Sequence, residues 1–403
     1  MRRFCAGRLP GLITIALAAL LAVILLPVWG AVAQSGEARE YFTQGNAYSE
    51  QGENEKAIDA FSKSIELDPN FLPTYINRGV AYNRLGLREN ALLDYSKAIE
   101  VDPTRSISYH NRAGIYRTLG LYEEALLDYN RAIELDSAFG HAYSGRGFTY
   151  LELGQYEEAL LDYSKAVELE PKNAFFYEGR GKAHYHIDQY EEALLDYSKA
   201  IELNPELAGA YQGRALTYGA LGQPEDALAD YASLIALEPD NVERYRDRAS
   251  YHYELGQYDE AISDYTSALE LTPDSVVLRV LRGITYEALA QYEEALLDYG
   301  RAVALGPQNS TAHWNTAELY ALLERYDDAL TSYSTCIDLD PDNAEAYRRR
   351  ADTLLKLDRP SSALSDYEKA LELSPESEEY QSLVNTLRET LSTGNTVTGP
   401  LMP

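Results

Sequence analysis

The chain has 403 residues, carries a formal net charge of −29 and is 45% hydrophobic. So acidic a surface is poorly suited to nucleic acid or to anionic lipid, because both are bound through clustered Lys and Arg. It suits a neutral or basic protein partner instead. We therefore expect no nucleic-acid partner, and membrane contact only through the N-terminal segment.

Residues 1–33 have the pattern of a targeting segment. Three arginines among the first eight residues precede an apolar run from Leu12 to Leu26. Ala31-Val32-Ala33 then matches a signal-peptidase site, with cleavage before Gln34. The alternative is an uncleaved membrane anchor, since residues 9–28 are long enough to span a bilayer. Either way the positive end stays inside, so we expect an exported protein that is periplasmic, secreted or anchored on the extracytoplasmic side.

After a short linker at residues 34–37, the sequence repeats every 34 residues without insertion or deletion. Nine prolines lie on one 34-residue grid, and Ser137 takes the one remaining place. These prolines are Pro69, Pro103, Pro171, Pro205, Pro239, Pro273, Pro307, Pro341 and Pro375. The grid defines ten repeats over residues 38–377, each with positions 1 to 34. A fixed period of this size indicates a solenoid whose core is built between neighbouring repeats.

Each repeat has the pattern of two helices joined by a turn. In repeat 5, apolar residues from Ala193 to Ile201 recur at helical spacing, and Pro205 ends the helix. Glycine at position 15 interrupts the chain between the two helices in six repeats. Position 20 is alanine in all ten, which allows two helices to approach closely. The pattern predicts an all-α fold of helix–turn–helix repeats.

The full pattern resembles the tetratricopeptide repeat family. It consists of an aromatic at position 4, Gly or Ala at 8, Tyr at 11, Ala at 20, an aromatic at 24, Ala at 27 and Pro at 32. Arg279 and His313 depart from it at position 4, and Leu234 departs at position 27. The resemblance implies antiparallel helix pairs stacked into a right-handed superhelical solenoid. It also implies that the first helices line a concave groove, which usually binds peptide segments.

We expect the partner-binding groove at positions 2, 5, 9, 12 and 13 of the first helices. Apolar and aromatic residues there would anchor a partner segment, and Arg or Lys would orient it. The alternative is that some of them pack between adjacent first helices. The candidates are Ile76, Val80, Arg84, Arg117, Phe148, Phe175, Lys182, Tyr185, Arg246, Tyr253, Val277, Val280, Ile284 and Trp314.

Positions 7 and 23 vary together among the repeats. Position 7 is Arg in eight repeats, and position 23 is Asp in the same eight. The two exceptions coincide as well, with Gln44 and Ala60 in repeat 1 and Thr316 and Ser332 in repeat 9. Because co-varying positions suggest contact, we predict an Arg–Asp pair between the two helices of each repeat. Common descent of copied repeats is the alternative.

Catalytic chemistry has little support in the sequence. The six histidines are scattered from His110 to His313 with no third ligand or nucleophile beside them. Cys336 takes a small-residue position, which predicts a buried thiol. We therefore expect no enzyme activity, catalytic residue, metal or cofactor. The acids of the second helices provide solubility, or alternatively a site for a basic partner.

Two further segments stand out. Residues 378–391 show one apolar stripe and are predicted to form a C-terminal capping helix over the last repeat, followed by a disordered tail at 392–403. In repeat 6, Gly209, Gly213 and Gly219 fall within one helix, which suggests a flexible joint.

These observations predict an exported or membrane-anchored, non-catalytic scaffold that binds a protein or peptide segment in its groove. The alternative is a structural or assembly factor, held by an uncleaved N-terminal helix and using its acidic outer wall. The sequence does not indicate the oligomeric state.

Overall fold

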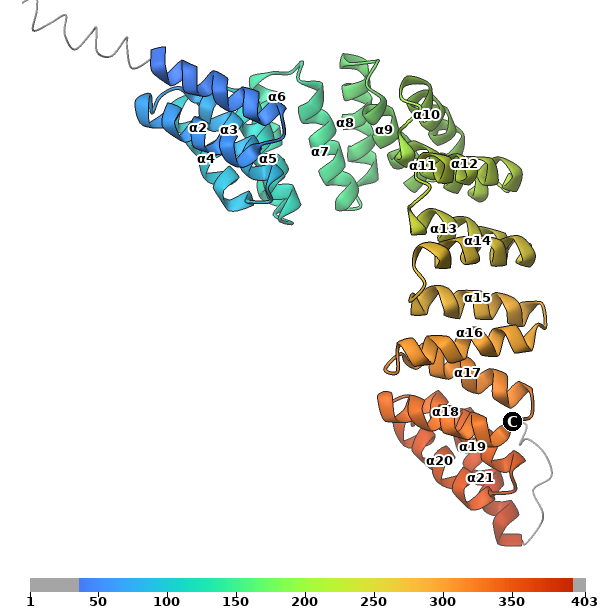
Figure 1. Cartoon of the computed structure of the whole chain (residues 1–403). Helices are drawn as coiled ribbons and strands as arrows, with labels where there is room; N and C mark the ends of the chain where they lie inside the picture. The colour runs from blue at the N-terminus through green and yellow to red at the C-terminus, as the bar shows by residue number, and fades with distance from the viewer. Residues whose placement is uncertain (1–35, 394–403) are drawn as a thin grey trace, which may run out of the picture. The chain divides into compact units, whose positions relative to one another are not determined.

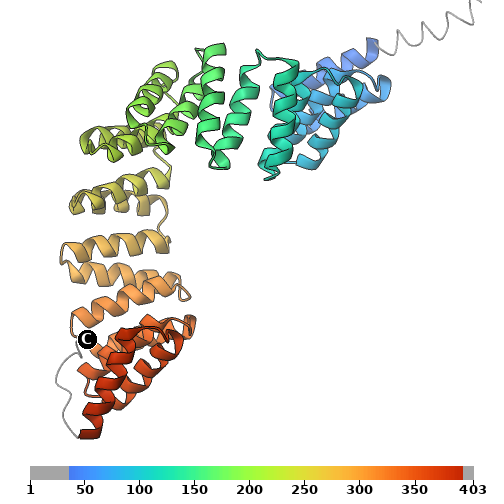
Figure 2. The ribbon, with the colours of Figure 1, turned by 180° about the vertical axis from the view of Figure 1, so that it is seen from behind.

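The computed structural model describes residues 36–393, and every regular element within them is a helix. The chain divides into two compact units, Met1–Gln223 and Pro224–Pro403. The division falls inside repeat 6, between its two helices. Within each unit the helices lie side by side in successive pairs, as Figures 1 and 2 show from opposite sides. The predicted all-α repeat architecture is confirmed.

The first unit begins with a helix at residues 36–50. It continues with α2 (Asn54–Leu67), α3 (Leu72–Arg84), α4 (Arg88–Val101), α5 (Ser106–Thr118), α6 (Tyr122–Leu135), α7 (Gly140–Glu152), α8 (Tyr156–Leu169), α9 (Ala174–His186), α10 (Tyr190–Leu203) and α11 (Ala208–Ala220).

The second unit contains α12 (Pro224–Leu237), α13 (Val242–Glu254), α14 (Tyr258–Leu271), α15 (Val276–Ala288), α16 (Tyr292–Leu305), α17 (Ser310–Leu322), α18 (Tyr326–Leu339), α19 (Ala344–Lys356), α20 (Pro360–Leu373) and α21 (Glu378–Thr393). In both units the odd-numbered helices up to α19 are the first helices of repeats, and the even-numbered ones are the second helices.

The turn between the two helices of a repeat requires a left-handed residue at position 15. All six glycines there have φ between 68° and 76°. The other four repeats place Asp188, Ala290, Glu324 and Asp358 at this position, with φ between 55° and 60°. This conformation is unfavourable for residues with a Cβ, so these four turns are held by the packing of the helices on either side.

In the core of each repeat, small residues pack against an aromatic ring. The alanine at position 20 is fully buried in all ten repeats, and the aromatic at position 24 is at most 5% exposed. A Cβ added at Gly79 would lie 2.6 Å from Cε1 of Tyr95 in the same repeat. Position 8 is therefore small because the ring at position 24 occupies the space beside it.

Seven of the eight predicted Arg–Asp pairs are confirmed. In each, the Arg Nε and Nη2 donate to the two carboxylate oxygens of the Asp sixteen residues later, as from Arg146 to Asp162 at 2.7 and 2.6 Å. The pairs are Arg78–Asp94, Arg112–Asp128, Arg146–Asp162, Arg180–Asp196, Arg248–Asp264, Arg282–Asp298 and Arg350–Asp366. The eighth, Arg214 with Asp230, stays a prediction.

The same arginines also reach back to the preceding repeat. Nη1 of Arg78 donates to Ser62 at 2.9 Å, and Nη1 of Arg146 donates to Asn130. Arg112, Arg214, Arg282 and Arg350 contact Ser96, Ser198, Thr266 and Ser334 in the same way. Five of these six guanidinium groups, all except that of Arg214, are therefore shown to bond residues of two successive repeats, which the sequence comparison did not reveal.

The last helix, α21, covers the final repeat. Leu383, Val384 and Leu387 are buried against Ala351 and Tyr367. It extends two residues beyond the predicted end, because the hydroxyls of Ser392 and Thr393 donate to the carbonyl of Glu389 and satisfy the last turn. The first helix likewise includes residues 36 and 37, which we had expected in the linker.

Two predicted segments lie outside the described residues: the signal or anchor at 1–33, and the tail from residue 394 onward. Within residues 36–393, no helix has the length and apolarity needed to cross a membrane.

In α11, Gly213 is required by packing against a tyrosine ring, whereas Gly209 lies against the end of a flexible glutamate side chain. A Cβ added at Gly209 would lie 2.3 Å from Oε1 of Glu178, and one added at Gly213 would lie 2.3 Å from Cζ of Tyr197. These glycines therefore serve close approach to repeat 5. The joint that we expected in repeat 6 stays a prediction, although the division between the two units falls in that repeat.

Replacing Asp162 with Asn should destabilise the first unit by about 3 kcal/mol, because it leaves the guanidinium of Arg146 without a charged partner in a site where both side chains are mostly buried. The exposed Glu158→Gln change on the same helix is the control, and should cost less than about 0.5 kcal/mol. Urea unfolding followed by circular dichroism measures both changes, and equal stabilities would contradict the structural role of the pair.

Candidate functional site on the inner face of repeats 3 to 5

The first helices of the first unit form a continuous face. Helix α5 contacts α7, α7 contacts α9, and α9 contacts α11, while each second helix packs mainly against the first helices beside it. We call the exposed surface of these first helices the inner face. It carries the positions at which we predicted the groove.

A pocket of about 380 Å³ opens on the inner face of repeats 3 to 5. It brings together four of the predicted groove residues: Arg117 on α5, Phe148 on α7, and Phe175 and Lys182 on α9. Its remaining lining residues are His110, Gly114, Tyr129, His141, Ser144, Gly145, Tyr163, Glu178 and Gly179.

The two phenylalanines form the apolar part of the pocket. Phe175 is 60% exposed and Phe148 is 38% exposed, so both rings are open to a ligand. The guanidinium of Arg117 lies 4.3 Å from the centre of the Phe148 ring, a distance that favours cation–π attraction. An exposed aromatic beside an arginine is typical of a binding hot spot.

The charges around the pocket are paired. Nη1 of Arg117 donates to Oε2 of Glu152 at 3.2 Å, and Nζ of Lys182 donates to Oε1 of Glu178 at 2.5 Å. Glu178 is only 9% exposed, so Lys182 compensates an acid that is largely removed from water. The pocket therefore offers polar groups without a strong net charge of either sign.

The floor of the pocket depends on tyrosines that the sequence analysis assigned to the framework. A Cβ added at Gly145 would lie 2.5 Å from Cε1 of Tyr129, and one added at Gly179 would lie 2.1 Å from Cε1 of Tyr163. Glycine at position 6 thus lets the ring of the preceding repeat lie directly beneath the inner face, where each tyrosine lines the pocket although it is only 2% exposed. Burial raises the pKa of both tyrosines, and Arg117 opposes this rise. Their phenols therefore remain protonated donors.

Position 6 could have revealed this floor from the sequence. It is glycine only in repeats 4, 5 and 6, and elsewhere it carries a larger residue. The ten residues are Thr43, Asn77, Asn111, Gly145, Gly179, Gly213, Asp247, Leu281, Asn315 and Arg349. We had not included position 6 among the groove positions.

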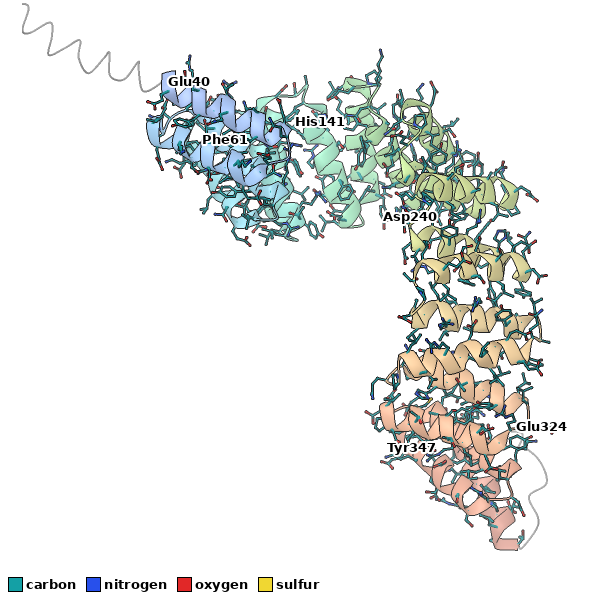
Figure 3. The ribbon with its side chains drawn as sticks, in the orientation of Figure 1. Glu40, Phe61, His141, Asp240, Glu324 and Tyr347 are labelled. Atoms are coloured by element: carbon teal, nitrogen blue, oxygen red, sulfur yellow. The ribbon has the colours of Figure 1, made fainter. Side chains whose placement is uncertain are left out.

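Two histidines complete one side of the pocket. The ring of His110 packs 5.6 Å from that of Tyr129 and 5.0 Å from that of Phe139. Burial, with a smaller effect of His141, lowers the pKa of His110 to about 4. Its buried Nδ1 has no hydrogen-bond partner among residues 36–393. His141, at the start of α7 in Figure 3, lies 3.6 Å from Glu170.

The remaining predicted residues of the first unit lie on either side of this pocket. Val80 and Arg84 line a second, smaller pocket of about 360 Å³. The Arg84 guanidinium there donates to the hydroxyl of Ser49 at 2.9 Å. Ile76 is half-buried on α3. Tyr185 packs against the core of repeat 5, with its ring 5.6 Å from that of Tyr190.

In the second unit one prediction is wrong. Val280 is 6% exposed and belongs to the core cluster around Tyr299, so it cannot contact a partner. Its side chain is covered because position 5 of α15 faces the next first helix, α17. Val277, one turn earlier on the same helix, is 57% exposed.

The other predicted residues of the second unit are partly occupied by contacts within it. Arg246 forms ion pairs with Glu243 and Asp247. Tyr253 and Ile284 pack against core clusters. Trp314 packs edge-on to the ring of Tyr333, with the ring centres 5.9 Å apart.

The described residues offer no arrangement for metal binding. Within residues 36–393, no group of three or more His, Cys, Asp or Glu side chains is placed to hold a metal ion. Cys336 is buried, and burial raises the pKa of its thiol to about 11. A thiol with so high a pKa is a poor nucleophile at neutral pH.

Replacing Gly179 with Ala should destabilise the first unit by about 1–3 kcal/mol, because the added methyl group overlaps the ring of Tyr163. Gly300→Ala is the matched control. Gly300 lies in α16 with no heavy atom within 4 Å of an added Cβ, so alanine there should stabilise the helix by about 0.5–1 kcal/mol. Urea unfolding measures both, and effects of the same sign would contradict the packing described above.

Comparison with known proteins agrees with this architecture. Family models described as tetratricopeptide repeat match residues 72–105, 174–207, 197–229, 216–281, 280–334 and 344–377. A model described as TPR repeat matches residues 45–86, 113–154, 149–188 and 317–358. Together they cover most of the ten repeats. No curated protein matched the sequence.

Several solved structures are similar to this chain or to part of it. A tetratricopeptide repeat protein from Parabacteroides merdae is 22% identical, with a TM-score of 0.49, and the match covers 62% of this chain and 99% of that one. YrrB, described as a TPR protein with an unusual peptide-binding site, is 26% identical over 46% of this chain and 96% of its own, with a TM-score of 0.38. Yeast Tom70 is 15% identical over 89% and 96%, with a TM-score of 0.41. This chain belongs to the tetratricopeptide repeat family of protein–protein interaction scaffolds.

Proposed function

We propose that this protein is an exported, non-catalytic scaffold that holds a segment of a partner protein on the inner face of repeats 3 to 5. The observation that carries this proposal is the pocket that unites Arg117, Phe148, Phe175 and Lys182. An apolar side chain of the segment inserts between the two phenylalanine rings. Desolvating that side chain and the open rings supplies the main driving force.

The polar groups of the pocket orient the segment. Arg117 can donate to backbone carbonyls of an extended chain, since a guanidinium has five donors. Because Glu152 and Glu178 already balance the two cations, the pocket does not require an acidic ligand. This supports a neutral or basic segment, in keeping with the net charge of −29.

The proposed binding can be tested with peptides selected from a random 12-residue display library against the whole chain. We expect the selected peptides to share an aromatic or large aliphatic residue and to lose at least tenfold in affinity on Phe148→Ala/Phe175→Ala, measured by fluorescence anisotropy. Both rings are exposed, so the helix content should not change.

The matched control is Val277→Ala, an exposed apolar residue on α15 of the second unit. It should leave the affinity unchanged. Selected peptides that bind the double Phe variant as tightly as the wild type would exclude this pocket as the site.

The export of the protein is supported only by residues 1–33, and we propose that they are removed before Gln34. The mature protein isolated from a host that exports it should then have the mass of residues 34–403. The Ala33→Leu variant should keep the segment, because a signal peptidase requires a small residue there. A wild-type mass that includes residues 1–33 would favour the alternative of an anchored assembly factor that uses its acidic outer wall.

A further inference from the structure

A row of leucines on the second helices of the first unit is exposed to solvent. Position 22 is leucine in four consecutive repeats, on α4, α6, α8 and α10. These residues are Leu93, Leu127, Leu161 and Leu195, with exposed fractions of 69%, 68%, 72% and 73%. We call them the leucine ladder. They lie on the second helices, away from the first-helix pocket described above.

Packing within the repeat does not require these leucines. The preceding residue at position 21 faces inward, as Leu92 and Leu160 do where they pack against core clusters. The next residue of the helix then points about 100° away, toward solvent. Elsewhere position 22 is leucine only at Leu297, and the other repeats carry polar or small residues there. Those residues are Asp59, Ala229, Ser263, Thr331 and Ser365. The fold therefore tolerates residues other than leucine at this position.

The ladder is bordered by negative charge. Exposed acids stand one turn before each leucine, as Glu123 and Glu124 do before Leu127. The Lys or Arg four residues after each leucine forms an ion pair with the glutamate three residues further on, at distances of 2.7–2.9 Å. Those pairs are Lys97–Glu100, Arg131–Glu134, Lys165–Glu168 and Lys199–Glu202. Within residues 36–393, no ion pair is described for the acids before the leucines. The border is therefore anionic at Leu127, Leu161 and Leu195, and it is balanced at Leu93, where the exposed Arg88 stands beside Glu89.

The charge of this border decides between possible occupants. A second copy of the chain would bring one acidic border against another, which costs free energy. An anionic membrane surface would be repelled for the same reason. A segment with an apolar stripe between rows of Lys or Arg would bury the leucines and neutralise the acids at once.

We propose that the leucine ladder is a second docking surface, which binds a basic amphipathic helix of a partner protein. The second helices of successive repeats each pack against the first helix between them, and a helix is about 10 Å across. A partner helix rises 1.5 Å per residue, so one that crosses the repeats meets successive leucines at intervals of at least about seven residues. A helix with an apolar residue in each of four heptads is therefore about the shortest that reaches all four leucines.

The test uses three fluorescein-labelled synthetic peptides of 28 residues and the whole chain. The first has a leucine heptad stripe flanked by lysines, the second has the same stripe flanked by glutamates, and the third has the composition of the first in scrambled order. We expect the lysine-flanked peptide to bind at least tenfold more tightly than the other two, by fluorescence anisotropy. Equal binding of the scrambled peptide would overturn the proposal, because it would show attraction by charge alone.

The variant L93S/L127S/L161S/L195S should lose at least tenfold in affinity for the lysine-flanked peptide. The corresponding four-fold Leu→Met variant keeps the apolar surface and should retain binding. The inner-face variant F148A/F175A should bind this peptide like the wild type, which separates this surface from the proposed peptide pocket. Undiminished binding by the serine variant would overturn the proposal.

Two further measurements address the other occupants. In sedimentation experiments, the wild-type chain and the serine variant should show the same oligomeric state. Vesicles of phosphatidylcholine with phosphatidylserine should not bind the leucine ladder. Ladder-dependent self-association or vesicle binding would overturn the assignment of a basic helical partner.

Discussion

The guanidinium at position 7 is the point on which the stacking of this protein depends. In the seven pairs described, the guanidinium forms two hydrogen bonds with the aspartate of its own repeat. In most of them it also donates to a side-chain hydroxyl or amide oxygen of the preceding repeat. Because both charges are largely removed from water, the geometry tolerates little displacement. Repeat 9 has Thr316 in place of the arginine and Ser332 in place of the aspartate. The preceding repeat has Gly300 where the others carry the hydroxyl or amide, so all three partners are lost together.

Around this fixed frame, the inner face varies through the size of a few side chains. In repeats 3 and 4 the rings of Tyr129 and Tyr163 lie directly beneath glycines of the next repeat and form the floor of a pocket. In repeats 8 to 10 the phenol at the same position instead donates to an internal carboxylate, as where Tyr299 donates to Glu287 at 3.0 Å. The space of the pocket thus depends on the absence of a Cβ above the ring.

The first unit offers two surfaces of different chemistry on opposite types of helix. The inner-face pocket has open aromatic rings and balanced charges, which suit an extended neutral segment. The leucine ladder has isolated aliphatic side chains beside unbalanced acids, which suit a basic helix. Because the two proposed surfaces use different helices of the same repeats, the two proposals allow two partner segments to bind the unit at once. A scaffold built this way would bring two partners together without a conformational change.

Spacing within one 34-residue unit was enough to predict the repeat boundaries, the helix pairs, the turn between them and the Arg–Asp pairing. It also placed Arg117, Phe148, Phe175 and Lys182 at the predicted groove positions. Which candidates are accessible depends instead on how whole helices pack: Val277 is open and Val280 is buried, although both are valines on one helix. The exposure of the leucine ladder and the position of Tyr129 beneath the pocket likewise follow from the fold, because they depend on side chains contributed by neighbouring helices.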